Sequence, residues 1–353
     1  MENVSFLLQN CGIVITNVEW KEFQLRVKVA RYVALILLAV APLLLAGLSC
    51  LLNLLFLSAA LLGLRTGKLS KVRYVFLLNR VLADCLGALI IFTTIFSLSR
   101  FSSGFVHFVN TSSKWRLSVV IVAIYGNLII VSLSYLAVTG LQLVAVCRPL
   151  WYRQFVTIKK ALVSVAIIWI FSLLFTFSFA TVSRSTIYEP NTTFCPSKPC
   201  GYLLLGTFSG TVTCVFVCVV LLHATSLLIA FRKGKVARQR LHSSALGNPF
   251  RMSLNLVVFT LGNLPIIAVG LAQVIFVRGT AEILRMLDEK NFCALLESRS
   301  ALFQFNLRMA IAYTTFFARM NFDVLVNFAN DKTFRALLID FLLCRRFVKP
   351  AQV

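Results

Sequence analysis

The sequence predicts an all-α membrane protein: a bundle of seven transmembrane helices with its N-terminus outside and a short amphipathic helix after the seventh span. Composition is the first observation, because 59% of the 353 residues are hydrophobic and only 13% are charged, against about 25% charged in soluble domains. Patterning is the second, since the apolar residues form continuous blocks long enough to cross a hydrocarbon core of about 30 Å. Continuous runs without a period of two favour helices over strands.

Seven blocks have this length, and each is expected to form one span. In chain order they cover residues 33–64, 75–98, 117–147, 161–182, 203–231, 252–277 and 301–328. The sequence is therefore divided into an extracellular N-terminus (1–32), a seven-helix bundle (33–328) and a cytoplasmic helix with a tail (329–353).

The basic residues indicate a membrane environment and orient the chain. Lys and Arg number 35 against 12 Asp and Glu, a net charge of +23. They form small clusters between the apolar runs, which favours retention in the cytoplasm and contact with anionic lipid headgroups over a nucleic-acid surface. With the N-terminus outside, the three Asn-x-Ser/Thr sequons also fall on exterior segments, so glycosylation is expected at Asn3, Asn110 and Asn191.

Two predicted spans carry an Arg and an Asp four positions apart. Arg80 precedes Asp84 in the second span, and Arg319 precedes Asp323 in the seventh. A charge at bilayer depth costs at least about 2.5 kcal/mol on insertion scales, so such residues are paired or functional. We expect each acid to pair with the base one turn away on its own helix. Arg308, nearer the exterior end of the seventh span, meets an anionic ligand or snorkels to the headgroups, and snorkelling is favoured.

Four of the ten cysteines fall on predicted exterior segments, where disulfides form. Four cysteines allow three pairings. We favour Cys195 with Cys200 and Cys11 with Cys293, with four free thiols as the alternative. Cys344 follows an apolar face and precedes two arginines, which predicts palmitoylation at the inner surface.

Enzyme signatures are missing from the sequence. It contains no phosphate-binding or dinucleotide-binding glycine pattern, no His-Glu-x-x-His and no nucleophile elbow. Its three histidines, His107, His223 and His242, are too scattered for a metal site. We expect neither catalysis nor a cofactor nor a bound metal.

Short strings in several spans match one known pattern. Asn53 lies in the first span before a basic turn, residues 73–84 end on Asp84 in a Leu-Ala-x-x-Asp-like run, Pro149 opens a Pro-Leu-x-Tyr loop, and Pro265 lies within the sixth span. With the seven spans, they resemble the rhodopsin-like (class A) G-protein-coupled receptors. Within that class the strings are most similar to the fish odorant-receptor-like branch. The resemblance implies a receptor at the plasma membrane that binds a small molecule and activates a heterotrimeric G protein.

The sequence departs from this class at its switch positions. Gln142 stands where the class has the Arg of Asp-Arg-Tyr, Asn263 stands where it has a Trp two residues before Pro265, and residues 323–327 replace Asn-Pro-x-x-Tyr with a stretch that begins at Asp323 and ends at Asn327. A receptor-like protein without G-protein coupling is therefore an alternative. A transporter or channel that uses the intramembrane Arg and Asp residues is another, although inverted repeats are missing.

The resemblance also suggests a role for the intramembrane charges. In this class the acid of the second helix and the facing part of the seventh surround a sodium ion. Arg319 is expected to replace that ion as a tethered cation between Asp84 and Asp323, with purely structural salt bridges as the alternative. Asn53, Asn127 and Asn263 are expected to form hydrogen bonds between helices.

The expected ligand follows from the same bundle. The third helix offers no acid, so an apolar or weakly polar, odorant-like molecule is favoured over a charged amine. Asn263 and Arg308 are the candidate ligand contacts. The protein is then an orphan or chemosensory receptor in olfaction-like signalling.

Overall fold

The computed structural model describes residues 40–67, 69, 71–101, 114–187, 198–237, 249–275 and 299–342, and the isolated positions 25, 29 and 36. Within them the chain is helical. The helices are α3 (Ala41–Arg65), α4 (Lys71–Phe101), α5 (Lys114–Cys147), α6 (Pro149–Phe155), α7 (Ile158–Ile187), α8 (Lys198–Ala237), α9 (Pro249–Ile275), α12 (Arg299–Asn330) and α13 (Lys332–Leu342).

Each of the seven predicted spans corresponds to one long helix, so the predicted fold class is confirmed. Within the described ranges, five helices are long and apolar enough to cross a membrane by their sequence alone, and α9 has a shorter apolar stretch, Val257–Ala272. α12 carries Arg308, Arg319 and Asp323, which lower its hydropathy. Several helices extend beyond the predicted windows, because helical hydrogen bonds continue after the apolar residues end.

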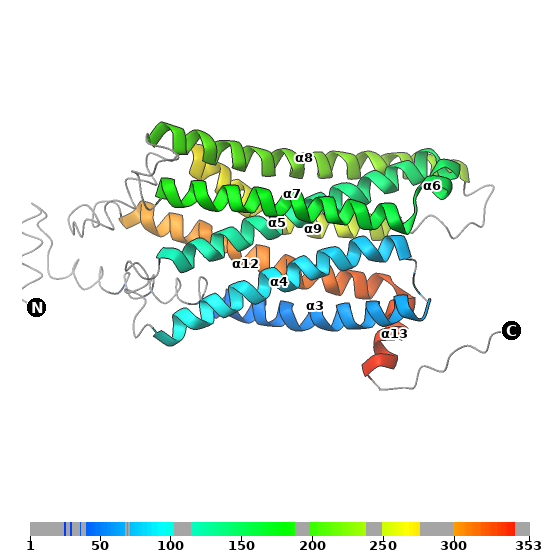
Figure 1. Cartoon of the computed structure of the whole chain (residues 1–353), viewed down its shortest axis with the longest axis horizontal. Helices are drawn as coiled ribbons and strands as arrows, with labels where there is room; N and C mark the ends of the chain where they lie inside the picture. The colour runs from blue at the N-terminus through cyan, green and yellow to red at the C-terminus, as the bar shows by residue number, and fades with distance from the viewer. Residues whose placement is uncertain are drawn as a thin grey trace, which may run out of the picture.

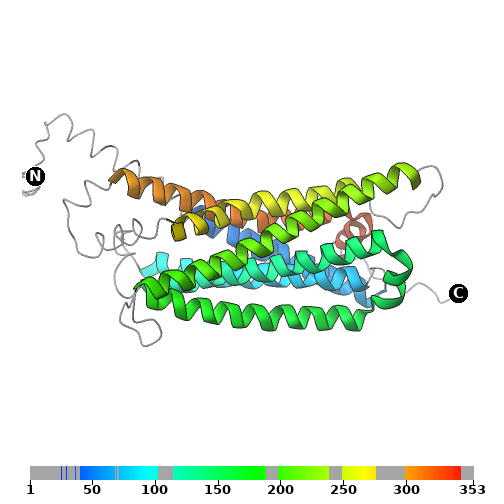
Figure 2. The same cartoon turned by 90° about the horizontal axis from the view of Figure 1, so that it is seen from above.

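The long helices run side by side along the length of the molecule (Figures 1 and 2). α5 lies centrally and contacts α4, α7 and α8, while α12 packs between α3 and α9. α6 and α13 lie at the same end of the bundle, where α3 ends and α4 begins (Figure 1). The short α6 is a helical turn beginning at Pro149, a residue whose fixed φ suits the first position of a helix.

Leucine, isoleucine and phenylalanine side chains cover the outside of the bundle. On α7 alone, Leu162, Ile167, Ile170, Leu174 and Phe177 are each more than half exposed. A surface of this kind is costly in water and neutral in lipid. The protein is therefore a multi-pass membrane protein.

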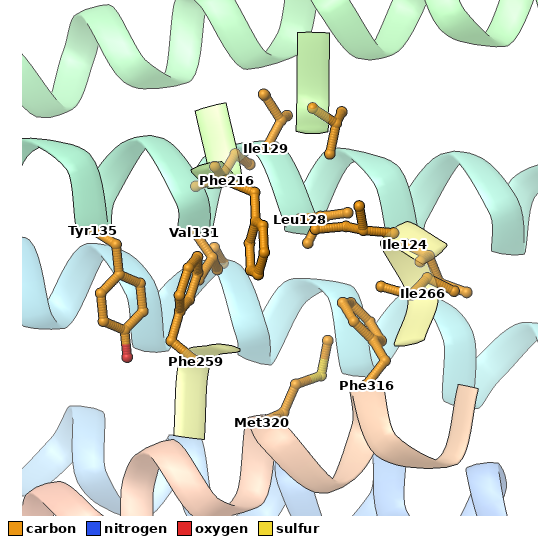
Figure 3. Packing of buried hydrophobic residues seen from close by; sticks show 14 of the residues in the cluster. Ile124, Leu128, Ile129, Val131, Tyr135, Phe216, Phe259, Ile266, Phe316 and Met320 are labelled. Atoms are coloured by element: carbon orange, nitrogen blue, oxygen red, sulfur yellow. The ribbon is translucent and has the colours of Figure 1, made fainter. Parts of the chain in front are cut away.

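Aromatic and branched side chains from four helices fill the centre of the bundle (Figure 3). Figure 3 shows Leu128 and Val131 of α5 beside Phe216 of α8, facing Phe259 of α9 and Phe316 of α12. Lipid is as apolar as these residues, so the core is held by close packing and by polar contacts between helices.

The predicted amphipathic helix is α13, which begins immediately after α12. Asp331 caps it, because its Oδ1 accepts the backbone N–H groups of Thr333 and Phe334, both at 3.1 Å. The Oδ2 of Asp331 accepts the hydroxyl of Tyr74 at 2.7 Å. The Phe334 ring packs on Phe56 with the centroids 4.2 Å apart. α13 is thereby attached to both α3 and α4.

Several predicted residues fall where the structure gives no description of their side chains. The three sequons and Cys11, Cys195, Cys293 and Cys344 lie outside the described residues. The backbone of Cys200 lies in the first turn of α8, and its side chain is not described. The glycosylation, disulfide and palmitoylation expectations therefore stay predictions.

Candidate functional site

Four charged side chains meet in the interior between α4 and α12. Nη2 of Arg319 lies 2.7 Å from Oδ1 of Asp84, and Nη1 of Arg80 lies 3.9 Å from Oδ2 of Asp323. Each of the four residues is at most 6% exposed. The two positive and two negative charges cancel, so the cluster is neutral as a whole.

The expected pairing of Arg80 with Asp84 on one helix was wrong, because Arg80 reaches Asp323 on the other helix. α4 and α12 run in opposite directions, so two Arg-x-x-x-Asp segments place each Arg beside the other helix's Asp. An Arg one turn before an acid is also the weaker order for a pair within a helix. Arg319 and Asp323 do lie within ion-pair distance, at 3.8 Å between Nη1 and Oδ2, which is too long for a hydrogen bond.

Asn127 of α5 bonds both members of the Arg319–Asp84 pair. Its Nδ2 donates to Oδ1 of Asp84 at 2.9 Å, and its Oδ1 accepts from Nη2 of Arg319 at 3.0 Å. Arg319, Asp84 and Asn127 therefore form a closed ring of hydrogen bonds between three helices. Nε and Nη1 of Arg319 form no hydrogen bond among the described residues.

Tyr135 of α5 contacts both members of the Arg80–Asp323 pair, a role that the sequence did not predict. Its hydroxyl donates to Oδ1 of Asp323 at 2.7 Å. The guanidinium carbon of Arg80 lies 4.1 Å from the Tyr135 ring centroid, a cation–π contact. Phe259 of α9 packs on the same ring, 4.3 Å away. A buried tyrosine in an apolar span usually has a hydroxyl partner, and that rule was the available signal.

A glycine on α9 makes room for Arg319. A Cβ at Gly262 would lie 2.7 Å from Cγ of Arg319, closer than side-chain carbons approach one another. The guanidinium of Arg319 also lies 5.2 Å from the ring centroid of Phe316 on its own helix. Gly262 therefore positions Arg319 by letting α9 approach α12 closely.

Three further asparagines that the sequence singled out bond within their own helices. Nδ2 of Asn53 donates to the Ser49 carbonyl, Nδ2 of Asn263 to the Phe259 carbonyl, and Nδ2 of Asn327 to the Asp323 carbonyl. The expected bonds from Asn53 and Asn263 to other helices are therefore not formed among the described residues, whereas Asn127 does bond across helices. The amide oxygens of Asn53 and Asn263 have no partner in the described ranges.

The remaining candidate residues lie away from the charge cluster. Gln142 is half-buried near the end of α5, and its Oε1 has no hydrogen-bond partner within the described part of the chain. Pro265 is half-buried inside α9. Arg308 is exposed on α12, an orientation that suits headgroups better than an interior ligand.

A second polar contact joins three helices. Nδ2 of Asn79 donates to Oγ of Ser134 at 2.6 Å, and Oδ1 of Asn79 accepts Nε1–H of Trp169 at 2.6 Å. Asn79 thereby ties α4 to α5 and α7. The sequence did not predict this contact.

The described helices are thus long and apolar, and they are joined in the interior by a neutral charge network and by the Asn79 contact. Comparison with curated protein sequences gives no match. Residues 46–305 match the family model described as the serpentine type 7TM GPCR chemoreceptor Srv. This match supports the broader part of the resemblance, a seven-helix chemoreceptor of the G-protein-coupled receptor type. It supports neither the rhodopsin-like class nor its fish odorant-receptor-like branch. The chain belongs to the Srv family of serpentine seven-transmembrane chemoreceptors.

Proposed function

We propose that this protein is a chemosensory receptor of the plasma membrane that binds a small apolar or weakly polar molecule and signals through a heterotrimeric G protein. Residues 1–32 lie outside the cell, and residues 329–353 lie in the cytoplasm. The Srv match over residues 46–305 supports the receptor assignment. The observation that carries the mechanism is the neutral charge network, which joins α4, α5 and α12 at mid-depth.

A receptor needs two arrangements of its helices whose populations a ligand shifts. The network supplies contacts that depend on helix position, because hydrogen bonds at 2.7 Å between Arg319 and Asp84 and between Tyr135 and Asp323 are lost when a helix moves by an ångström or two. Ligand binding that displaces α5 or α12 then changes the energy of the network. The network holds the resting arrangement.

Arg319 acts in this network as a tethered cation. Its guanidinium lies between two carboxylates, at 2.7 Å from Asp84 and 3.8 Å from Asp323. A covalently held cation keeps both acids neutralised without an ion from solution. Switching of this receptor is therefore independent of sodium.

The alternative of a receptor that has lost its coupling rests on Gln142. It stands near the inner end of α5 and carries an amide oxygen without a partner in the described ranges. A neutral amide forms weaker hydrogen bonds than a guanidinium, so any contact with a G protein at this position is weakened. The transporter alternative is less favoured, because the four interior charges pair with one another instead of lining an open path.

The test is G-protein activation in cells that carry the protein at the surface, challenged with pools of odorants and small metabolites, beside a Gln142→Arg variant. A response from the unmodified chain establishes a working receptor. A response from Gln142→Arg alone, at equal surface level, supports the uncoupled alternative. Silence from both variants at normal surface levels contradicts coupling and favours a role without a G protein.

A further inference from the structure

Two hydroxyls that bond no described residue face one glycine in the half of the bundle away from α6 and α13. A Cβ at Gly270 of α9 would lie 2.8 Å from the hydroxyl oxygen of Tyr125 on α5 and 3.7 Å from Oγ of Ser209 on α8. Neither hydroxyl forms a hydrogen bond within the described part of the chain. Ser209 is only 6% exposed. The three helices thus bring two unused polar groups to one place.

Five other hydroxyls, those of Ser132, Ser172, Ser226, Thr260 and Thr314, also lack partners in the described ranges, but their oxygens are fully buried. The hydroxyl oxygens of the half-buried Tyr125 and of Ser209 are not fully closed off, so they can meet a partner. Elsewhere in this bundle the interior tyrosine Tyr135 does have a partner, Asp323. On α8 the hydroxyls of Thr207, Thr211 and Thr213 bond to the preceding turn, whereas that of Ser226 is fully buried without a described partner. The hydroxyls of Tyr125 and Ser209, which no described residue uses, are therefore available to a partner outside the chain.

The surroundings of this pair are aromatic and uncharged. Phe179 of α7 lies against the Tyr125 ring, with centroids 4.5 Å apart, and Phe208 of α8 meets Phe179 edge-on at 5.7 Å. Phe179 is only 2% exposed. Aromatic faces hold apolar groups well, whereas a charged ligand would be desolvated here without a counter-charge.

We propose that Tyr125 and Ser209 are the polar contacts of the ligand site, and that the ligand is a neutral molecule with an apolar body and one oxygen function, such as a ketone, aldehyde or alcohol. This inference rests on the proposed receptor function and names the ligand class of its site. Gly270 is the residue that leaves both hydroxyls accessible to the ligand oxygen. Any larger residue there would meet the Tyr125 hydroxyl.

The site is joined to the charge network by a short stretch of α5. Tyr125 lies two positions before Asn127, which bonds both Asp84 and Arg319. Tyr125 faces α7, α8 and α9, and Asn127 faces α4 and α12. A ligand that pulls on the Tyr125 hydroxyl therefore turns the same segment that holds Arg319 in place.

The experiment measures direct binding to the full-length protein in lipid nanodiscs, by the shift of its thermal unfolding midpoint with probe concentration. The probes are straight-chain ketones and alcohols, each paired with the alkane of equal chain length. Ketones and alcohols are expected to bind the unmodified protein more tightly than their alkanes. Tyr125→Phe and Ser209→Ala are each expected to weaken the oxygenated probes about 2- to 12-fold, the value of one hydrogen bond, and to leave alkanes unchanged.

Gly270→Ala is expected to weaken the binding of the oxygenated probes as well. Gly210→Ala on α8 is the matched control, because a Cβ there meets nothing within 4 Å, and it is expected to leave probe binding unchanged. Equal binding of ketones and alkanes, no binding of any probe, or full ketone affinity in Tyr125→Phe overturns the inference. If ketones bind selectively through Tyr125 and no G protein is activated, the proposed function fails and the ligand site stands. If other compounds activate the receptor independently of Tyr125, only the ligand site fails.

Discussion

Arg319 and Asp84 are separated by 235 positions in the chain, yet Nη2 of the first lies 2.7 Å from Oδ1 of the second in the interior of the bundle. The contact brings the seventh long helix to the second. Asn127 bonds both partners and adds the third long helix.

Replacing Asp84 with Asn is expected to destabilise the protein by about 3–5 kcal/mol, because it leaves a buried guanidinium without its nearest counter-charge. The double variant Asp84→Asn with Arg319→Gln removes both charges and is expected to recover most of that loss. Thermal unfolding of the purified proteins in detergent measures both effects. A double variant as unstable as the two single variants added together contradicts a direct pair.

Arg319→Ala is expected to make the stability of the protein depend on sodium, because Asp84 and Asp323 then share the interior without a cation from Arg319. Sodium should raise the unfolding midpoint of the variant and leave that of the unmodified protein unchanged, with choline as the salt control. Arg308→Ala removes an exposed arginine from the same helix and is the matched control. If Arg319→Ala reaches the surface and does not respond to sodium, Arg319 is not a tethered cation.

Tyr135→Phe is expected to cost about 1–3 kcal/mol, because Oδ1 of the buried Asp323 loses the hydroxyl that donates to it. Tyr125→Phe, ten positions earlier on α5, removes a hydroxyl that bonds no described residue and is expected to leave the stability of the ligand-free protein unchanged. The two unfolding midpoints compare the bonded and the unbonded tyrosine directly. Equal midpoints for the two variants would show that the Asp323 bond contributes nothing.

Gly262→Ala is expected to destabilise the protein by about 1–3 kcal/mol, since the new methyl group overlaps the side chain of Arg319 and overpacks the interface of α9 with α12. Gly210→Ala, in open space on α8, is expected to be neutral or to stabilise its helix by up to about 1 kcal/mol. Basal G-protein signalling should change in Gly262→Ala and stay unchanged in Gly210→Ala. Similar unfolding midpoints for the two variants would contradict the positioning role of Gly262.

The sequence predicts the helices because each long apolar block must become one in lipid. It also places Arg80, Asp84, Arg319 and Asp323 on the correct helices. Their pairing needed one further step, since the second and the seventh span of a serpentine chain run in opposite directions and set each Arg beside the other helix's Asp. The distances between these helices result from the packing of the bundle and cannot be derived from the sequence of either span.

The roles of Tyr135, Asn79 and Gly262 were not predictable in the same way. Their helices are apolar on all sides, so the sequence carries little information about which side faces the interior. Lipid-facing and core-facing residues are then of the same types, as leucine and phenylalanine occur on both faces here. Only the packed structure shows which polar group of one helix faces which of another.

The opposed order of charges on α4 and α12 also limits how these helices move. A slide of α12 by one turn, about 5.4 Å, would bring Arg319 level with Arg80 in one direction and Asp323 level with Asp84 in the other. Both positions set like charges against each other and leave the remaining pair without partners. The two Arg-x-x-x-Asp segments therefore fix the register of α12 against α4. Because sliding is unfavourable, α12 responds by rotation and tilt.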